Sequence, residues 1–195
     1  MVVTQDRWRQ LFAVAVGQHG LVSSLDARAL GLADSYLGTM LARGSLERSA
    51  RGVYRFPELP VTRLTVLMEA VLWVGRDAVL SHDAVLSLHE LASANPRVIR
   101  VTTPWRVRRS GPPAAVEVVR RRLVPSDVTV HEGIPTTTVA RALRDCRGLV
   151  MPHRLVEAAH EAHARGLVRR GELLALLADL GAEAVGGEGP GAPDG

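Results

Sequence analysis

The sequence LADSYLGTMLARG, residues 32–44, followed at once by SLERSARGVYR, residues 45–55, decides how this chain is organised. Asp34 or Ser35 is placed to cap a short helix, and Gly44 is placed to end it. Between them lies a stripe of apolar side chains at helical spacing, formed by Leu37, Met40 and Leu41. The segment therefore predicts a short helix with one buried face.

Polar side chains are left for the outer face of this helix, namely Ser35, Tyr36, Thr39 and Arg43. Small polar, aromatic and guanidinium groups suit a groove of DNA. Residues 46–48 and 53–55 are short strand candidates joined by an Arg-Gly turn, which gathers three arginines around one loop, Arg48, Arg51 and Arg55. A short helix that runs into an arginine-rich hairpin predicts a winged helix-turn-helix, with the helix in the major groove and the hairpin against phosphate.

Two more helices are predicted before this segment. Apolar residues at i, i+3, i+4 and i+7 predict a helix over residues 6–18. Ser23 and Asp26 have the spacing of a capping box and open a second helix that stops at Gly31, the turn of the helix-turn-helix. Residues 1–57 are thus expected to form a DNA-binding domain.

The segment Pro57-Glu58-Leu59-Pro60 interrupts the pattern and marks the predicted start of a second domain, residues 61–181. One amphipathic helix is expected to end near Gly75, and Ser81 is expected to cap another. β-Branched runs at residues 98–102, 115–119 and 128–130 predict three strands of a small antiparallel sheet.

Helices are predicted for the rest of this domain. Ile134-Pro135 should turn into a helix capped by a threonine, Pro152 should open the next helix, and residues 172–180 the last. Residues 182–195 are rich in glycine and proline and are expected to be a disordered tail. The expected fold class is α+β, an N-terminal winged helix-turn-helix followed by a mixed helical domain with a small antiparallel sheet.

Composition bounds the class of protein. The chain has 195 residues, of which 47% are hydrophobic, enough for a packed core. No window reaches the apolar length needed to cross a bilayer, and the first residues lack the apolar run of a signal peptide, so we expect a cytoplasmic protein without membrane contact. Cys146 is the single cysteine, which excludes an internal disulfide and indicates a core thiol.

Positive charge is concentrated in the middle of the chain. All 24 basic side chains are arginines, which fits a GC-rich genome as well as a demand for bidentate contacts. Residues 97–122 hold eight arginines and one acidic residue. A second basic surface is therefore a candidate, made of Trp105, Arg106, Arg108, Arg109, Arg120, Arg121 and Arg122. It is either a nucleic-acid surface with an aromatic platform or a hairpin edge protected by charge.

Catalytic patterns are weak. Gly-rich phosphate loops are missing from the sequence, and a chain without lysine cannot use a catalytic lysine. Ser81, His82 and Asp83 are adjacent and cannot converge as a triad on a helix. His153, Glu157 and His160 have metal-ligand spacing, but no second helix carries a matching motif, so a solvated helix face is the preferred interpretation. We expect no enzyme, cofactor or metal.

Short motifs in the chain resemble the antitoxins of the AbiEi type. In the first sixty residues they are QHGLV (18–22), ALGL (29–32), GSLER (44–48) and RGVYR (51–55). Further on, AVLSHDAVLSLH (78–89) and GIPTTTVARALRD (133–145) resemble the next domain of that family, so that the likeness spans roughly residues 8–147. The resemblance implies a winged-helix repressor that binds repeats in its own promoter, with a nucleotidyltransferase toxin as partner.

Three hypotheses follow. The first is a non-enzymatic transcriptional repressor that binds double-stranded promoter DNA with inverted repeats as a monomer or weak dimer. The family resemblance implies that this repressor is the antitoxin of an AbiE-like toxin–antitoxin pair. The second is a protein-interaction module whose helix-rich C-terminal half binds the toxin directly. The third is a metal-dependent enzyme that uses His153, Glu157 and His160.

Overall fold

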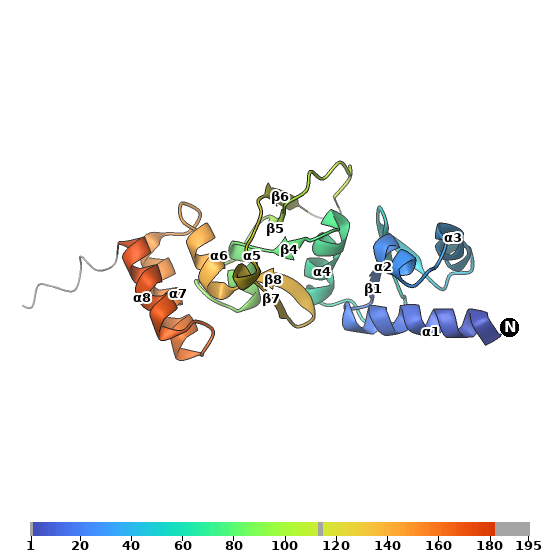
Figure 1. Ribbon diagram of the computed structural model, residues 1–195, viewed down its shortest axis with the longest axis horizontal. Helices are drawn as coiled ribbons and strands as arrows, with labels where there is room; N and C mark the ends of the chain where they lie inside the picture. Colours follow the sequence, from blue (N-terminus) through green and yellow to red (C-terminus); the bar gives the residue numbers. More distant parts are fainter. Residues whose placement is uncertain (1, 113–114, 182–195) are drawn as a thin grey trace, which may run out of the picture. The chain divides into compact units, whose positions relative to one another are not determined.

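The computed structural model describes residues 2–112 and 115–181, and the expected tail at residues 182–195 lies outside the described residues. The described residues form two compact units: residues 2–81 with 96–112 and 115–137, and residues 82–95 with 138–181. Each unit is described separately. The first unit contains helices and strands and the second contains helices, so the described chain as a whole confirms the α+β class (Figure 1).

The first unit begins with three helices and a three-stranded sheet. In chain order these elements are α1 (Val2–Gly17), β1 (Leu21–Ser23), α2 (Ser24–Ala29), α3 (Asp34–Ala42), β2 (Glu47–Ala50) and β3 (Val53–Arg55). The strand order is β1-β3-β2, and both pairs are antiparallel. The sequence predicted the three helices and the β2–β3 hairpin, but not β1, which is only three residues long.

Local chemistry explains most boundaries of these elements. Ser23 and Asp26 form the predicted capping box, in which the Ser23 hydroxyl accepts from the Asp26 backbone N–H at 3.2 Å. Gly44 follows the end of α3 with a φ of 71°, a conformation that glycine adopts without steric cost. The predicted cap of α3 was wrong: Ala33 is the N-cap and gives no side-chain hydrogen bond, because the Asp34 carboxylate binds Arg28 instead.

Aromatic rings close the core of this part of the unit. Trp8 and Phe12 stack with 4.9 Å between ring centroids, and both meet Phe56 edge-on, at 6.0 and 5.2 Å. Phe56 is fully buried and lies directly after β3. The rings therefore join the first helix to the end of the hairpin through geometry that adds to simple burial.

The remainder of the first unit is a five-stranded sheet with one long helix. Its elements are α4 (Arg63–Val74), β4 (Val79–Leu80), β5 (Ile99–Thr103), β6 (Val116–Arg120), the 3-10 turn Pro125–Asp127, β7 (Val128–His131) and β8 (Ile134–Thr137). The strand order is β6-β5-β4-β8-β7. Helix α4 has a capping box at Thr62 and Thr65 and packs on β4, β5 and β8.

The predicted small antiparallel sheet was wrong in two respects. The sheet is mixed, because β5 pairs with β6 and β4 pairs with β8 in parallel. The connection between Thr103 and Val116 is long enough to return the chain to the starting end of β5, as a parallel neighbour requires. In addition, the segment expected to turn at Pro135 is strand β8, with Pro135 opposite Val130.

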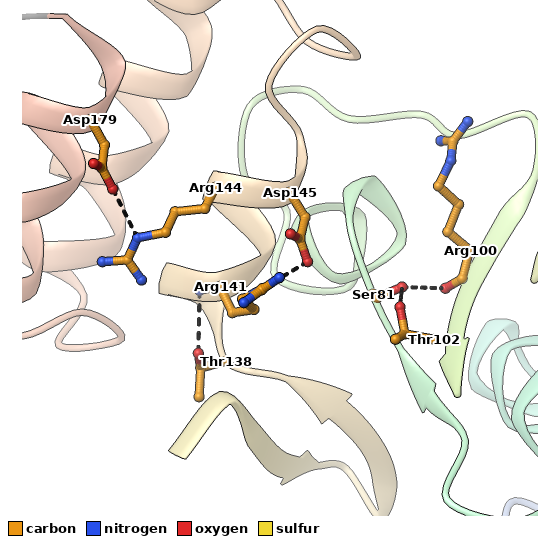
Figure 2. A network of polar contacts seen from close by, with 8 residues as sticks. All are labelled: Ser81, Arg100, Thr102, Thr138, Arg141, Arg144, Asp145 and Asp179. Carbon is orange, nitrogen blue, oxygen red and sulfur yellow. Dashed lines mark hydrogen bonds and ion pairs between the residues drawn. The ribbon is translucent and has the colours of Figure 1, made fainter. Parts of the chain in front are cut away.

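Four helices make up the second unit: α5 (Asp83–Leu88), α6 (Val139–Asp145), α7 (Pro152–Ala164) and α8 (Arg170–Leu180). Thr138 caps α6 as predicted, and Pro152 opens α7 as predicted. Arg144 on α6 binds Asp179 on α8 at 3.1 Å, and Arg141 binds Asp145 at 3.0 Å (Figure 2). Cys146 is buried, which confirms its assignment to the core.

Ser81 does not cap α5, contrary to the prediction. His82 is the N-cap and gives no side-chain hydrogen bond. The Ser81 hydroxyl instead donates to the Arg100 carbonyl at 3.3 Å and accepts from the Thr102 hydroxyl at 2.8 Å, within the sheet of the first unit (Figure 2). The serine belongs to strand pairing because it directly follows β4.

Truncating Phe56 tests the aromatic core. Phe56→Ala removes a fully buried ring and should lower the free energy of unfolding by about 3–5 kcal/mol. Val61→Ala, at a side chain that is 62% exposed, should stay within about 0.5 kcal/mol of the parent. Urea unfolding followed by tryptophan fluorescence measures both, and equal effects of the two substitutions would contradict this packing.

Candidate nucleic-acid interface

Helix α3 has a buried side and a polar side. Leu37 and Met40 face the core and are 1% and 5% exposed. The four residues expected on the outer face are placed outward to different degrees: Ser35, Thr39 and Arg43 are exposed, and Tyr36 is half-buried. This face combines hydroxyl groups with one guanidinium at the C-terminal end of the helix.

A bidentate contact on the surface links α2 to the start of α3. The Arg28 guanidinium donates to the two carboxylate oxygens of Asp34 at 3.3 and 3.0 Å. This hydrogen bonding, together with the charge of Asp34, raises the pKa of Arg28 above its ordinary value. Because both side chains are exposed, salt screens their attraction.

Thr39 is constrained within this face. Its hydroxyl donates to the Ser35 carbonyl at 3.0 Å, one helical turn earlier. The hydroxyl proton is thereby used inside the helix, while the oxygen lone pairs and the methyl group remain exposed. Thr39 can accept from a donor on a base edge or contact a thymine methyl, but it is not arranged to donate.

The three hairpin arginines differ in their surroundings. Arg51 is exposed at the turn, beside Gly52, whose φ is 78°. Arg48 is exposed with its guanidinium 5.7 Å from the centroid of the Tyr54 ring, a cation–π contact that orients it. Arg55 is half-buried, binds Glu47 at 2.5 Å and donates to the Leu59 carbonyl at 3.2 Å. The structure thus brings Arg48 and Arg51 to the surface of the hairpin and turns Arg55 into it.

A β-bulge at Ser49 interrupts the pairing of β2 with β3. Arg48 pairs with Tyr54 and Ala50 with Val53, so that Ser49 is an extra residue in β2. The Ser49 hydroxyl donates to Glu69 on α4. The bulge therefore ties the base of the hairpin to α4 and leaves the Arg51 turn beyond it.

The second basic surface is also divided. Trp105, Arg106, Arg108, Arg120, Arg121 and Arg122 are exposed. Arg109 is half-buried, and its guanidinium donates to the carbonyls of Trp73 at 2.7 Å and Leu72 at 3.5 Å. These carbonyls end α4, where the helix dipole is negative, so Arg109 acts as a cap from a distant loop.

Two residues that sequence reasoning did not single out fix Trp105. The indole Nε1 donates to the Asp77 carboxylate at 2.8 Å, and the Arg76 guanidinium lies 5.3 Å from the ring centroid. Both residues follow α4 directly. Their proximity to Trp105 depends on strand pairing between β4 and β5, and no signal in the local sequence indicates it.

The histidine cluster predicted on α7 lies on the exposed side of the helix. His153, Glu157 and His160 are exposed, and the nearby His163 Nδ1 lies 2.9 Å from the Val168 carbonyl. Within residues 2–112 and 115–181, no three His, Cys, Asp or Glu side chains are grouped so as to hold a metal ion. The geometry favours a solvated helix face.

Comparison with known proteins gives a family match over the first part of the chain. Residues 9–57 match the family described as "Transcriptional regulator, AbiEi antitoxin", which is the family that the sequence motifs resemble. The matched residues run from α1 to the end of the β2–β3 hairpin and contain α3. No curated protein matches the chain. In the described part of the chain, none of the helices has the length and apolar character needed to cross a membrane.

The structural role of Arg109 can be tested directly. Arg109→Ala leaves two carbonyls at the end of α4 without their charged donor and should lower the free energy of unfolding by about 1–3 kcal/mol. Arg108→Ala is the matched control, because this neighbouring arginine is exposed, and should change the value by no more than about 0.5 kcal/mol. Equal denaturation curves for the two variants would show that Arg109 is not a cap.

Proposed function

We propose that this protein is a DNA-binding transcriptional repressor and the antitoxin of an AbiE-like toxin–antitoxin pair. Residues 1–57 are its winged helix-turn-helix domain, and residues 61–181 form a second domain. The target is double-stranded promoter DNA with inverted repeats, bound in the cytoplasm by a monomer or weak dimer. The partner is a nucleotidyltransferase toxin, as in the family that the sequence resembles.

One observation carries the proposal: the polar face of α3 is exposed next to a hairpin that presents Arg48 and Arg51. An α-helix of this width fits the major groove, where Ser35, Thr39 and Arg43 would approach base edges. The hairpin would then lie against phosphate or the minor groove. The match of residues 9–57 to AbiEi transcriptional regulators supports the same interpretation.

The geometry refines the set of contacts. Tyr36 is half-buried and is proposed to contribute only its edge to the groove. Arg55 is proposed to position the hairpin rather than to bind DNA, since Glu47 and the Leu59 carbonyl occupy its guanidinium. Arg48 and Arg51 are the arginines proposed to contact the DNA backbone.

Substitution of Arg51 tests the hairpin contact. Arg51→Ala should weaken binding to every DNA sequence and reduce the slope of log K against log salt by about one phosphate contact. Mobility shifts on promoter and unrelated duplexes, at several salt concentrations, give both quantities. Arg97→Ala, at an exposed arginine outside α3 and the hairpin, is the control. An unchanged affinity and salt slope for Arg51→Ala would refute the hairpin assignment.

Substitution of Thr39 tests base recognition. Thr39→Val keeps the methyl group and removes the acceptor oxygen, so discrimination between the preferred site and a single-base variant should fall by about 1–3 kcal/mol. Binding to unrelated DNA should stay the same, because no positive charge is lost. Competition assays with a panel of single-base variants measure this. A uniform loss over all sequences would mean that Thr39 supports the fold rather than reads bases.

Direct binding of the toxin is a second candidate function. Leu149 and Met151 in the second unit line a cavity of about 330 Å³ and are 48% and 64% exposed, so that two large apolar side chains lie together on a surface that a protein partner could cover. Co-expression with the product of the adjacent gene tests it. A stable complex formed by a protein that ignores promoter DNA would favour this function over repression.

A further inference from the structure

The most distinctive feature outside the proposed DNA interface is a cleft of about 490 Å³ in the first unit. Six of the residues that line it are polar or aromatic: Asp77, Thr102, Thr103, Trp105, Arg121 and Arg122. Its volume is that of a site for a small organic ligand. Its composition combines a large aromatic ring with two guanidinium groups.

The aromatic ring is rigid and accessible at once. Hydrogen bonding to Asp77 and the contact with Arg76 fix the indole of Trp105, and its backbone N–H donates to the Thr103 hydroxyl at 3.4 Å. That hydroxyl donates to the Arg76 carbonyl at 3.0 Å, so the ring is held at several points. The side chain is nevertheless 48% exposed. A ring that is already ordered loses little entropy when a planar ligand stacks on it.

Strand pairing determines where the positive charge lies. Strands β5 and β6 are parallel, so their carboxyl ends meet at one edge of the sheet, and Arg121 continues the pairing by donating its backbone N–H to the Thr103 carbonyl at 3.0 Å. Arg121 and Arg122, which follow β6, therefore lie beside the C-terminal end of β5, two residues before Trp105. Both side chains are exposed and line the cleft.

The charge of the acidic lining residue is largely compensated. The Asp77 carboxylate binds the Trp105 indole and lies 3.5 Å from the Arg76 guanidinium. Arg121 and Arg122 therefore supply positive charge to the cleft beside an acidic residue that is already paired. Guanidinium groups match the geometry of phosphate oxygens and bind them through paired hydrogen bonds.

Protection of the sheet edge by charge is an alternative explanation for the arginines, but it explains less of the cleft than a bound ligand does. Strand β6 is at the edge of the sheet, and arginines near it would discourage pairing with another chain. Protection of a sheet edge explains the arginines, but it does not explain the anchored, half-exposed indole in the same cleft. A ligand with a planar ring and a phosphate would use the indole for stacking and the arginines for the phosphate.

We propose that this cleft binds one nucleotide, with the base stacked on Trp105 and the phosphate held by Arg121 and Arg122. The nucleotide is either free or one unit of a single-stranded nucleic acid, since both present the same base and phosphate. This site is separate from α3 and the hairpin and does not rest on the proposed repressor function.

Fluorescence anisotropy on the full chain tests the site with two probes, a fluorescein-labelled single strand of about twelve nucleotides and a fluorescent analogue of adenosine triphosphate. Trp105→Ala and Arg122→Ala should each weaken binding about tenfold. Trp105→Phe should retain most of the affinity, because it keeps an aromatic face. Arg108→Ala is the matched control, an exposed arginine of the same loop that does not line the cleft, and should bind like the parent protein.

The outcomes separate the sources of the nucleotide and the alternatives. Loss of both probes in Trp105→Ala supports a site for free nucleotides, and loss of the single strand by a protein that never binds the triphosphate supports a site for nucleic acid. Three results would overturn the proposal: neither probe binds, Trp105→Ala binds like the parent, or Arg108→Ala loses as much affinity as Arg122→Ala.

Circular dichroism checks that each variant is folded, and Arg51→Ala separates the two binding sites. This variant should keep the single-strand affinity while it loses affinity for duplex DNA. If single-strand binding falls with Arg51→Ala and not with Trp105→Ala, the probe is bound at the hairpin and the cleft proposal is wrong. Failure of duplex binding alone would count against the repressor function and leave the cleft intact.

Discussion

Burial of the inner side of α3 is the constraint on which the proposed DNA interface depends. Leu37 and Met40 belong to the same core as Leu11 of α1 and Phe56 after β3. Because these side chains are fixed in a shared core, the helix cannot rotate about its axis without exposing apolar surface. The direction of its polar face is therefore determined by packing on the opposite side, several residues away from any group that would meet DNA.

Sequence reasoning was most successful where structure is local. The helices, the capping box at Ser23 and the glycine that ends α3 depend on residues within one or two turns of each other, and the pattern of the sequence contains them. The family resemblance, confirmed over residues 9–57, came from motifs in the same region. Strand direction is different: the parallel pairing of β5 and β6 depends on how a long connection runs, and β-branched runs are alike in parallel and antiparallel sheets.

The candidate site shows the same limit for single side chains. The sequence located the arginines but could not distinguish those that face solvent from those used inside the protein. Arg55 binds Glu47 because the two residues are opposite each other in the β2–β3 register, and Arg109 reaches the end of α4 from a loop far along the chain. Both contacts arise from tertiary structure. Because Arg55 and Arg109 are used inside the protein, the basic surface contains fewer arginines than the sequence suggests.

The division of the chain into interleaved units has a consequence for synthesis on the ribosome. Residues 82–95 belong with residues 138–181, so α5 emerges before α6, the helix on which it packs, and before α7 and α8 of the same unit. The apolar residues of α5 lack their neighbours on α6 until residue 145 has been made, and the first unit lacks β8 until residue 137. During synthesis, α5 therefore exposes apolar surface that the folded second unit covers.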